Sequence, residues 1–224
     1  MAQRAPSAWR TLDRKHPEWW VLAIAAAAWL WIAAATGAGE HVHASAGIGR
    51  PIANWMAMTA AMMFPLVASQ LRAAAARSLW RRRHRAIALF LLGYGSAWLV
   101  VGVAVVELSA VLPAVSSPLA VSLMFVAALV WQRSTIYRHA VRACHREYPL
   151  APSGWKANID SAHYGWRVGV SCAITCWPLM TACALAHHDL TVMILAATVT
   201  TVSRIDPRAW PIVLRQLFIE KAFR

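Results

Sequence analysis

Soft sulfur donors are concentrated in two apolar segments of the chain. The first segment carries Met56, Met58, Met62 and Met63, and the second carries Cys172, Cys176, Met180 and Cys183. The spacings of four, four and three place the second set on one stripe of a helix. Thioether and thiolate groups are soft ligands that favour Cu(I). Ordinary core packing is the alternative, because methionine and cysteine also fill apolar cores well.

Imidazole and carboxylate donors gather in two short polar loops. One loop contains His41 and His43, and the other contains His187, His188 and Asp189. These side chains are ligands of zinc, copper and iron. The alternative is that histidines are tolerated at an interface without a ligand. The two loops form one site only if the helices that flank them pack together.

Glu107 is the acidic residue that we expect deepest inside an apolar segment. It precedes Pro113 by six residues, which is about 9 Å of helix. An ionisable side chain at such a depth in a membrane is costly and is a functional candidate. A structural ion pair with Arg50 is the alternative.

The elements that must position these donors are apolar helices. The chain has 224 residues, of which 59% are hydrophobic and 14% are charged, and its mean hydropathy is +0.48. A soluble domain would carry about a quarter charged residues. We therefore predict an all-α, polytopic transmembrane helical bundle with about six spans and no separate soluble domain.

The apolar runs give the predicted spans at about 19–36, 52–71, 86–112, 118–131, 166–186 and 190–203. Residues 1–18 precede this bundle of residues 19–203, and residues 204–224 follow it as a tail. The last run is short for a bilayer, so either Arg204 snorkels or the helix continues through Ile205 to a break at Pro207. We expect the end of the tail to form an amphipathic interfacial helix.

Two prolines, Pro65 and Pro178, fall inside predicted spans beside the sulfur donors. A proline in a helix removes one N–H group and leaves a backbone carbonyl without its helical partner. In lipid such a carbonyl must find another donor or line a cavity. We therefore expect a local kink at each proline.

The charge pattern predicts the orientation of the chain. The net charge is +13, and the basic residues cluster in the N-terminal segment, the second and fourth loops and the tail, whereas the other loops hold only Arg50. By the positive-inside rule both termini are cytoplasmic. This pattern indicates a multi-pass protein of a bacterial inner membrane. It predicts anionic lipids as partners and argues against nucleic acid.

Known catalytic motifs are missing from the sequence. It contains no phosphate-binding glycine loop, no His-Glu-x-x-His pattern and no nucleophile elbow. We therefore do not predict an enzyme. Three of the four cysteines lie in one apolar run, unlike the cysteines of a secreted disulfide framework.

Several motifs occur together between residues 52 and 195. They are Trp55-Met56, the Ala-Met-Met-Phe-Pro segment that ends at Pro65, the Tyr94, Trp98 and Gly102 pattern, and Cys172 to Met180. The chain resembles a bacterial family of predicted metal-binding integral membrane proteins of unknown function. Ile174 and Thr175 replace a glycine and a cysteine of the family motif. The resemblance therefore implies a divergent member of a metal-binding membrane family.

Two functions fit these observations. The first is a membrane protein that binds or handles a transition metal for homeostasis or cuproenzyme assembly. Copper is the expected metal, with zinc as the second choice. The second is a non-catalytic accessory subunit of a larger membrane complex, in which the same motifs serve packing against a membrane-protein partner.

Overall fold

The structure is a computed structural model that describes residues 12–13, 15–37, 49–111, 118–146 and 148–205. Every regular element within those ranges is a helix, which confirms the predicted all-α class. The α-helices are α2 (Trp19–Gly37), α3 (Gly49–Met63), α4 (Ala68–Ala76), α5 (Arg83–Val111), α6 (Pro118–Trp131), α7 (Thr135–Cys144), α8 (Gly154–Leu185) and α9 (Leu190–Ile205). The 3-10 helices are η1 (Pro65–Val67) and η2 (Trp80–Arg82).

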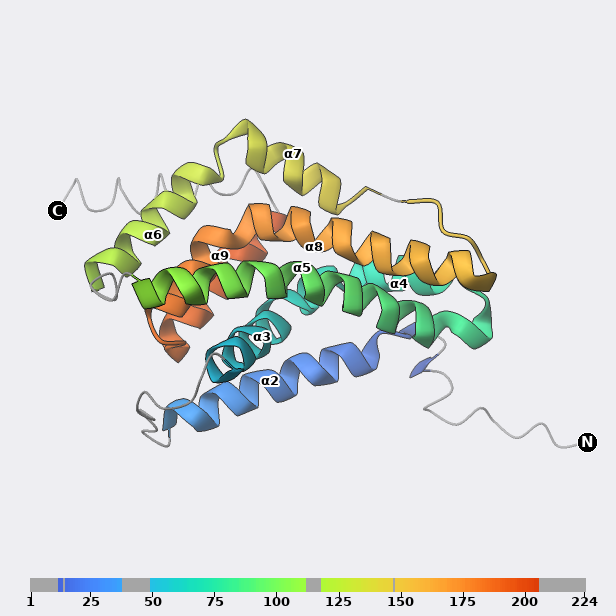
Figure 1. The fold of residues 1–224 in the computed structure, drawn as a ribbon, viewed down its shortest axis with the longest axis horizontal. Helices are drawn as coiled ribbons and strands as arrows, with labels where there is room; N and C mark the ends of the chain where they lie inside the picture. Colours follow the sequence, from blue (N-terminus) through green and yellow to red (C-terminus); the bar gives the residue numbers. More distant parts are fainter. Residues whose placement is uncertain (1–11, 14, 38–48, 112–117, 147, 206–224) are drawn as a thin grey trace, which may run out of the picture.

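The long helices alternate in direction along the chain. Figure 1 shows α2, α5 and α8 running from one end of the bundle to the other, while α3 with α4, α6 with α7, and α9 run back. The basic segment that precedes α5 therefore lies at the same end as the start of α2 and of α8. This alternation is the arrangement that the charge pattern requires.

The described helices support fewer spans than the apolar runs suggested. By length and composition, Trp80–Leu108 and Gly154–Leu185 could each cross a membrane. The number rises to four if each bent pair is one span, with bends of 48° between Gly49–Met63 and Pro65–Ala76 and of 79° between Pro118–Trp131 and Thr135–Cys144. The first and last runs, which we expected to be spans, form shorter apolar helices.

Helices α5 and α8 form the centre of the bundle because glycines let their backbones approach closely. A Cβ atom added at Gly93 would lie 1.9 Å from the carbonyl oxygen of Ala162. One added at Gly165 would lie 1.9 Å from the carbonyl oxygen of Phe90. Small residues allow such close packing of apolar helices. This close packing of α5 against α8 holds α8 in one rotation about its axis and so determines where its cysteines lie.

Each of the two prolines frees a backbone carbonyl that a side chain of another helix satisfies. Pro65 follows the end of α3 at the 48° bend, and the carbonyl oxygen of Ala61, four residues before it, accepts a hydrogen bond from Trp29 Nε1 at 2.9 Å. Pro178 lies inside α8. Each proline removes the N–H group that would have bonded the carbonyl four residues earlier, so an indole from another helix takes its place.

Trp131 donates a hydrogen bond to the carbonyl that Pro178 leaves without its helical partner. Its Nε1 donates to the carbonyl oxygen of Ile174 at 2.8 Å, and Ile174 is four residues before Pro178. The Trp131 ring also packs edge-on against Trp177, with centroids 5.8 Å apart. The expectation that each freed carbonyl finds a donor is therefore confirmed, and the donors join α2 to α3 and α6 to α8.

Helix bounds differ from the apolar runs at α8 and α9. Helix α8 begins at Gly154, although its apolar run begins near Trp166, because the polar first turns still pack against neighbouring elements and bury Asn158 and Ser161. Helix α9 continues through Ile205. This was one of the two alternatives predicted for the last apolar run. The predicted interfacial tail, residues 206–224, lies outside the described residues.

Candidate functional site

Three sulfur-bearing residues, Met63, Cys172 and Cys176, form what we call the sulfur cluster. The Sδ atom of Met63 lies 3.9 Å from the Sγ atom of Cys172. Cys176 follows Cys172 by one helical turn and therefore shares its face of α8. The exposed fractions are 0% for Met63, 0% for Cys172 and 2% for Cys176. The structure thus brings together members of both sulfur-rich segments.

Local helix chemistry explains how Met63 reaches the cysteines. Met63 is the last residue of α3, and the bend beyond it comes from Pro65, which cannot continue the hydrogen-bond ladder. The structure places Met63 against Cys172, one turn nearer the basic end of α8 than Cys176.

Two hydroxyl groups line the sulfur cluster. The hydroxyl of Tyr94 on α5 donates a hydrogen bond to Cys172 Sγ at 3.2 Å. The Oγ1 atom of Thr175 donates to the carbonyl oxygen of Cys172 at 2.8 Å and lies 3.4 Å from Cys176 Sγ. Tyr94 and Thr175 were not among the predicted ligands. Their roles here are to orient the sulfur atoms.

Arg204 is a third residue of the site that was not predicted from the sequence. It lies in the last turn of α9 and places Nη2 2.9 Å from Cys172 Sγ, 3.8 Å from Cys176 Sγ and 3.4 Å from Thr175 Oγ1. The snorkelling alternative for Arg204 is therefore wrong, because the guanidinium turns into the bundle. A cation beside a cysteine stabilises the thiolate, which is the metal-binding form.

The donor set suits a soft metal ion. Cu(I) prefers thiolate and thioether sulfur over oxygen ligands, and the sulfur cluster offers both types in a buried place. Among the described residues, no three His, Cys, Asp or Glu side chains gather closely enough to hold a metal ion. A metal at the sulfur cluster would therefore use the thioether of Met63 together with the two cysteines.

The other predicted sulfur ligands belong to the surrounding core. Met58, Met62, Met180 and Cys183 are between 0% and 4% exposed and lie in the same hydrophobic core as the sulfur cluster. Met56 is half-buried against that core. Their positions on α3 and α8 extend from the sulfur cluster toward the end of the bundle where α8 ends.

The structure describes one of the two loops of the predicted histidine site. His187 and His188 form the turn between α8 and α9 with φ angles of 50° and 62°, in the left-handed region that is strained for most residues. The Nε2 atom of His188 is buried and makes no hydrogen bond to the described residues. His41 and His43 lie outside the described residues, so the meeting of the two loops stays a prediction.

Asp189 has a clear structural role at the start of α9. Its Oδ1 atom accepts hydrogen bonds from the backbone N–H groups of Thr191 at 2.9 Å and Val192 at 3.1 Å. This is the geometry of an N-cap, which satisfies the free donors of the first helical turn. The carboxylate oxygen used by the cap is less available as a metal ligand.

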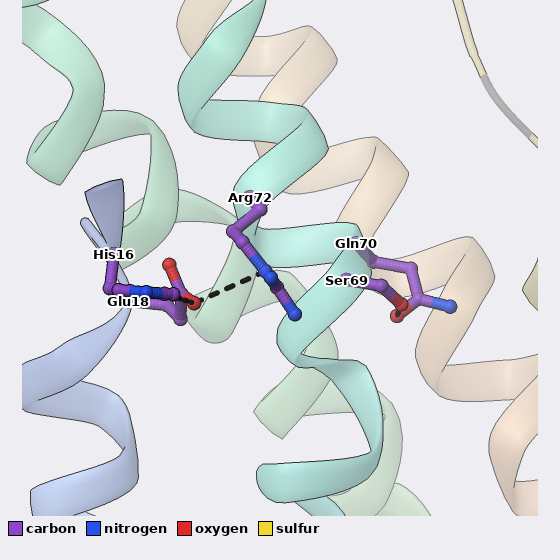
Figure 2. Close-up of polar contacts among 5 residues, drawn as sticks. All are labelled: His16, Glu18, Ser69, Gln70 and Arg72. Carbon is purple, nitrogen blue, oxygen red and sulfur yellow. Dashed lines mark hydrogen bonds and ion pairs between the residues drawn. The ribbon is translucent and has the colours of Figure 1, made fainter. Parts of the chain in front are cut away.

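Two acidic side chains have different surroundings in the structure. Glu107 is exposed on α5. Glu18, which the sequence did not single out, is 2% exposed, and its Oε1 atom lies 3.1 Å from Arg72 Nε and 3.4 Å from His16 Nδ1 (Figure 2). Glu18 lies at the edge of the first apolar run, and no pattern in the sequence indicates that tertiary packing buries it.

A second polar contact beside Glu18 connects the bundle to α7. Figure 2 shows Ser69 and Gln70 on α4, near Arg72. The hydroxyl of Ser69 donates to Gln70 Oε1 at 2.8 Å, and Gln70 Nε2 donates to the carbonyl oxygen of Cys144 at 3.1 Å. These bonds fix α4 against the end of α7 at the basic side of the bundle.

A family model matches most of the chain. The model of the PpoB2 family, described as a copper chaperone, matches residues 52–217. The sulfur cluster, Tyr94 and Arg204 all lie inside this range, whereas His41 and His43 precede it. No curated protein and no solved structure matches the chain.

Proposed function

The chain belongs to the PpoB2 family of copper chaperones, and we propose that it carries copper as Cu(I) on the sulfur cluster. The observation that carries this proposal is the 3.9 Å approach of Met63 Sδ to Cys172 Sγ, with Cys176 one turn away. Two thiolates and a thioether are the ligand types that Cu(I) prefers. Copper is here the cargo of the protein.

We place this copper carrier in a bacterial inner membrane as a multi-pass protein. Two to four helices are apolar and long enough to cross a bilayer. Large apolar side chains are exposed on the outside of the bundle, such as Leu30 at 72%, Leu92 at 68% and Leu119 at 69%. Exposed apolar surface on this scale marks a lipid or partner interface. The basic end would face the cytoplasm and its anionic lipids.

A route for the ion follows from the arrangement of donors. His187 and His188 lie at the end of the bundle where α8 ends, which is the outer end in this orientation. They would capture copper, and the methionines and Cys183 would line its path to the sulfur cluster. Copper would then pass to a membrane-protein acceptor, in homeostasis or cuproenzyme assembly.

Replacement of Met63 tests this proposal. Met63→Leu keeps the volume of the side chain but removes the thioether. We expect its Cu(I) affinity, measured by competition with a chromogenic chelator, to fall by about tenfold or more, as when groups that support a metal site are removed. X-ray absorption at the copper edge should show a sulfur first shell in the wild type.

Met193→Leu is the matched control, because Met193 is also 0% exposed but lies on α9 outside the predicted ligands. It should bind Cu(I) as the wild type does. Equal affinity of the Met63→Leu and Met193→Leu variants would contradict the role of Met63, and a first shell of nitrogen or oxygen would contradict the sulfur cluster as the site.

A further inference from the structure

Arg204 brings a positive charge into the bundle, and the proposed copper site would balance that charge. Its guanidinium is turned into the bundle, and the Nη1 atom is buried without a hydrogen-bond partner among the described residues. Glu18 and Asp13 form ion pairs with other basic side chains, and no ion pair seen among the described residues includes Arg204. Burial of an unpaired charge is costly, so this guanidinium needs an anion at the place where it lies.

The sulfur atoms beside Arg204 are the groups that can supply this negative charge. Nη2 lies 2.9 Å from Cys172 Sγ and 3.8 Å from Cys176 Sγ. Arginine stays protonated in proteins and has no lone pair to offer a metal. It can therefore neutralise a metal–thiolate group from beside it but cannot become one of its ligands.

We infer that Arg204 is a counter-cation that makes the sulfur cluster selective for monovalent over divalent metal ions. This inference rests on the proposed function. Cysteine binds metals as the thiolate, so two thiolates and one monovalent ion carry a net charge of about −1. Arg204 brings the buried group to neutrality. With a divalent ion, the same residues carry a net positive charge that no described carboxylate offsets.

The position of Arg204 on α9 supports this role. Residues 190–203 are apolar apart from threonines and a serine, and Arg204 follows them in the last turn. Helix α9 therefore places one charged side chain, that of Arg204, beside the cysteines of α8. The thioether of Met63 is neutral and does not change the charge balance.

Two variants of the full chain separate charge from packing. Arg204→Gln removes the charge and keeps a polar side chain, while Arg204→Lys keeps the charge. Each is purified in detergent and titrated with Cu(I), Ag(I) and Zn(II). We expect the wild type to favour Cu(I) and Ag(I) over Zn(II). In Arg204→Gln the ratio of Cu(I) to Zn(II) affinity should fall by about tenfold or more, the scale on which supporting groups tune a metal site.

Arg204→Lys should keep most of the wild-type preference, because the positive charge stays near the sulfur atoms. An unchanged ratio in Arg204→Gln, with Cu(I) still bound through the cysteines, would overturn the inference and leave the proposed function intact. A wild type that binds no Cu(I) would overturn both. If Arg204→Gln does not fold, the wild type decides: Zn(II) binding at the cysteines as tight as Cu(I) would overturn the inference, and a clear Cu(I) preference that persists in Arg204→Lys would support it.

Discussion

His188 combines a strained backbone with a half-buried imidazole whose Nε2 atom is buried. Burial of the ring, followed by the charge of neighbouring His187, lowers the pKa of His188 to about 4. The ring is therefore neutral at physiological pH, which is the state of imidazole that binds metals. A strained residue at a loop often marks a functional position. The Nε2 atom, which has no hydrogen-bond partner among the described residues, fits the proposed capture of an ion.

The low pKa of His188 makes stability depend on pH. An unfolded histidine titrates near 6.5, so the unfolded chain binds more protons than the folded chain between about pH 6.5 and pH 4. We expect the wild type to lose stability as the pH falls through this window. His188→Gln should lose less, and the exposed His187→Gln serves as the control.

Thermal unfolding in detergent, followed by circular dichroism at pH 7 and pH 4.5, measures this effect. The difference in melting temperature between the two pH values should be smaller in His188→Gln than in the wild type. The same difference in both proteins would show that His188 does not titrate with the lowered pKa.

Sequence reasoning identified some residues of the site and missed others. Spacing and ligand chemistry selected Met63, Cys172 and Cys176. Arg204 was missed because it follows Cys172 by 32 residues, and its position at the end of an apolar run looked like that of a residue at a membrane surface. Only the path of α9 shows that its side chain turns inward.

The carbonyls freed by the two prolines are features of whole elements that the sequence did predict. Pro178 and Pro65 each leave a carbonyl that a tryptophan from another helix satisfies. The identity of the donors, Trp131 and Trp29, could not be predicted, because it depends on which helices are neighbours. The early start of α8 was also missed, since its first turns are too polar to appear as an apolar run.

Trp131→Phe tests this support of α8. The change keeps an aromatic ring but removes the N–H group, so the carbonyl of Ile174 loses its donor. We expect the free energy of unfolding to fall by about 1–2 kcal/mol, the cost of an unpaired backbone group. Reversible unfolding in mixed micelles measures it. Trp155→Phe is the control, because Trp155 is 75% exposed; equal effects of the two changes would contradict the account.

At the scale of the whole molecule, composition alone was enough to predict the all-α class. The low charge content and the apolar runs leave few other architectures. The number of spans was predicted less well. The 48° bend divides the run at 52–71 into two helices, and the 79° bend separates the run at 118–131 from the helix Thr135–Cys144 that follows it. The accessory-subunit function stays a prediction, and a fixed partner in the purified particle would favour it.

We propose that this bundle holds copper on Cys172 and Cys176. Elemental analysis by mass spectrometry tests this on the protein purified from copper-supplied cells, with the Cys172→Ser/Cys176→Ser variant purified in the same way. We expect near-stoichiometric copper in the wild type and almost none in the folded variant. Equal copper in both proteins, or none in the wild type even after reconstitution with Cu(I), would contradict the claim.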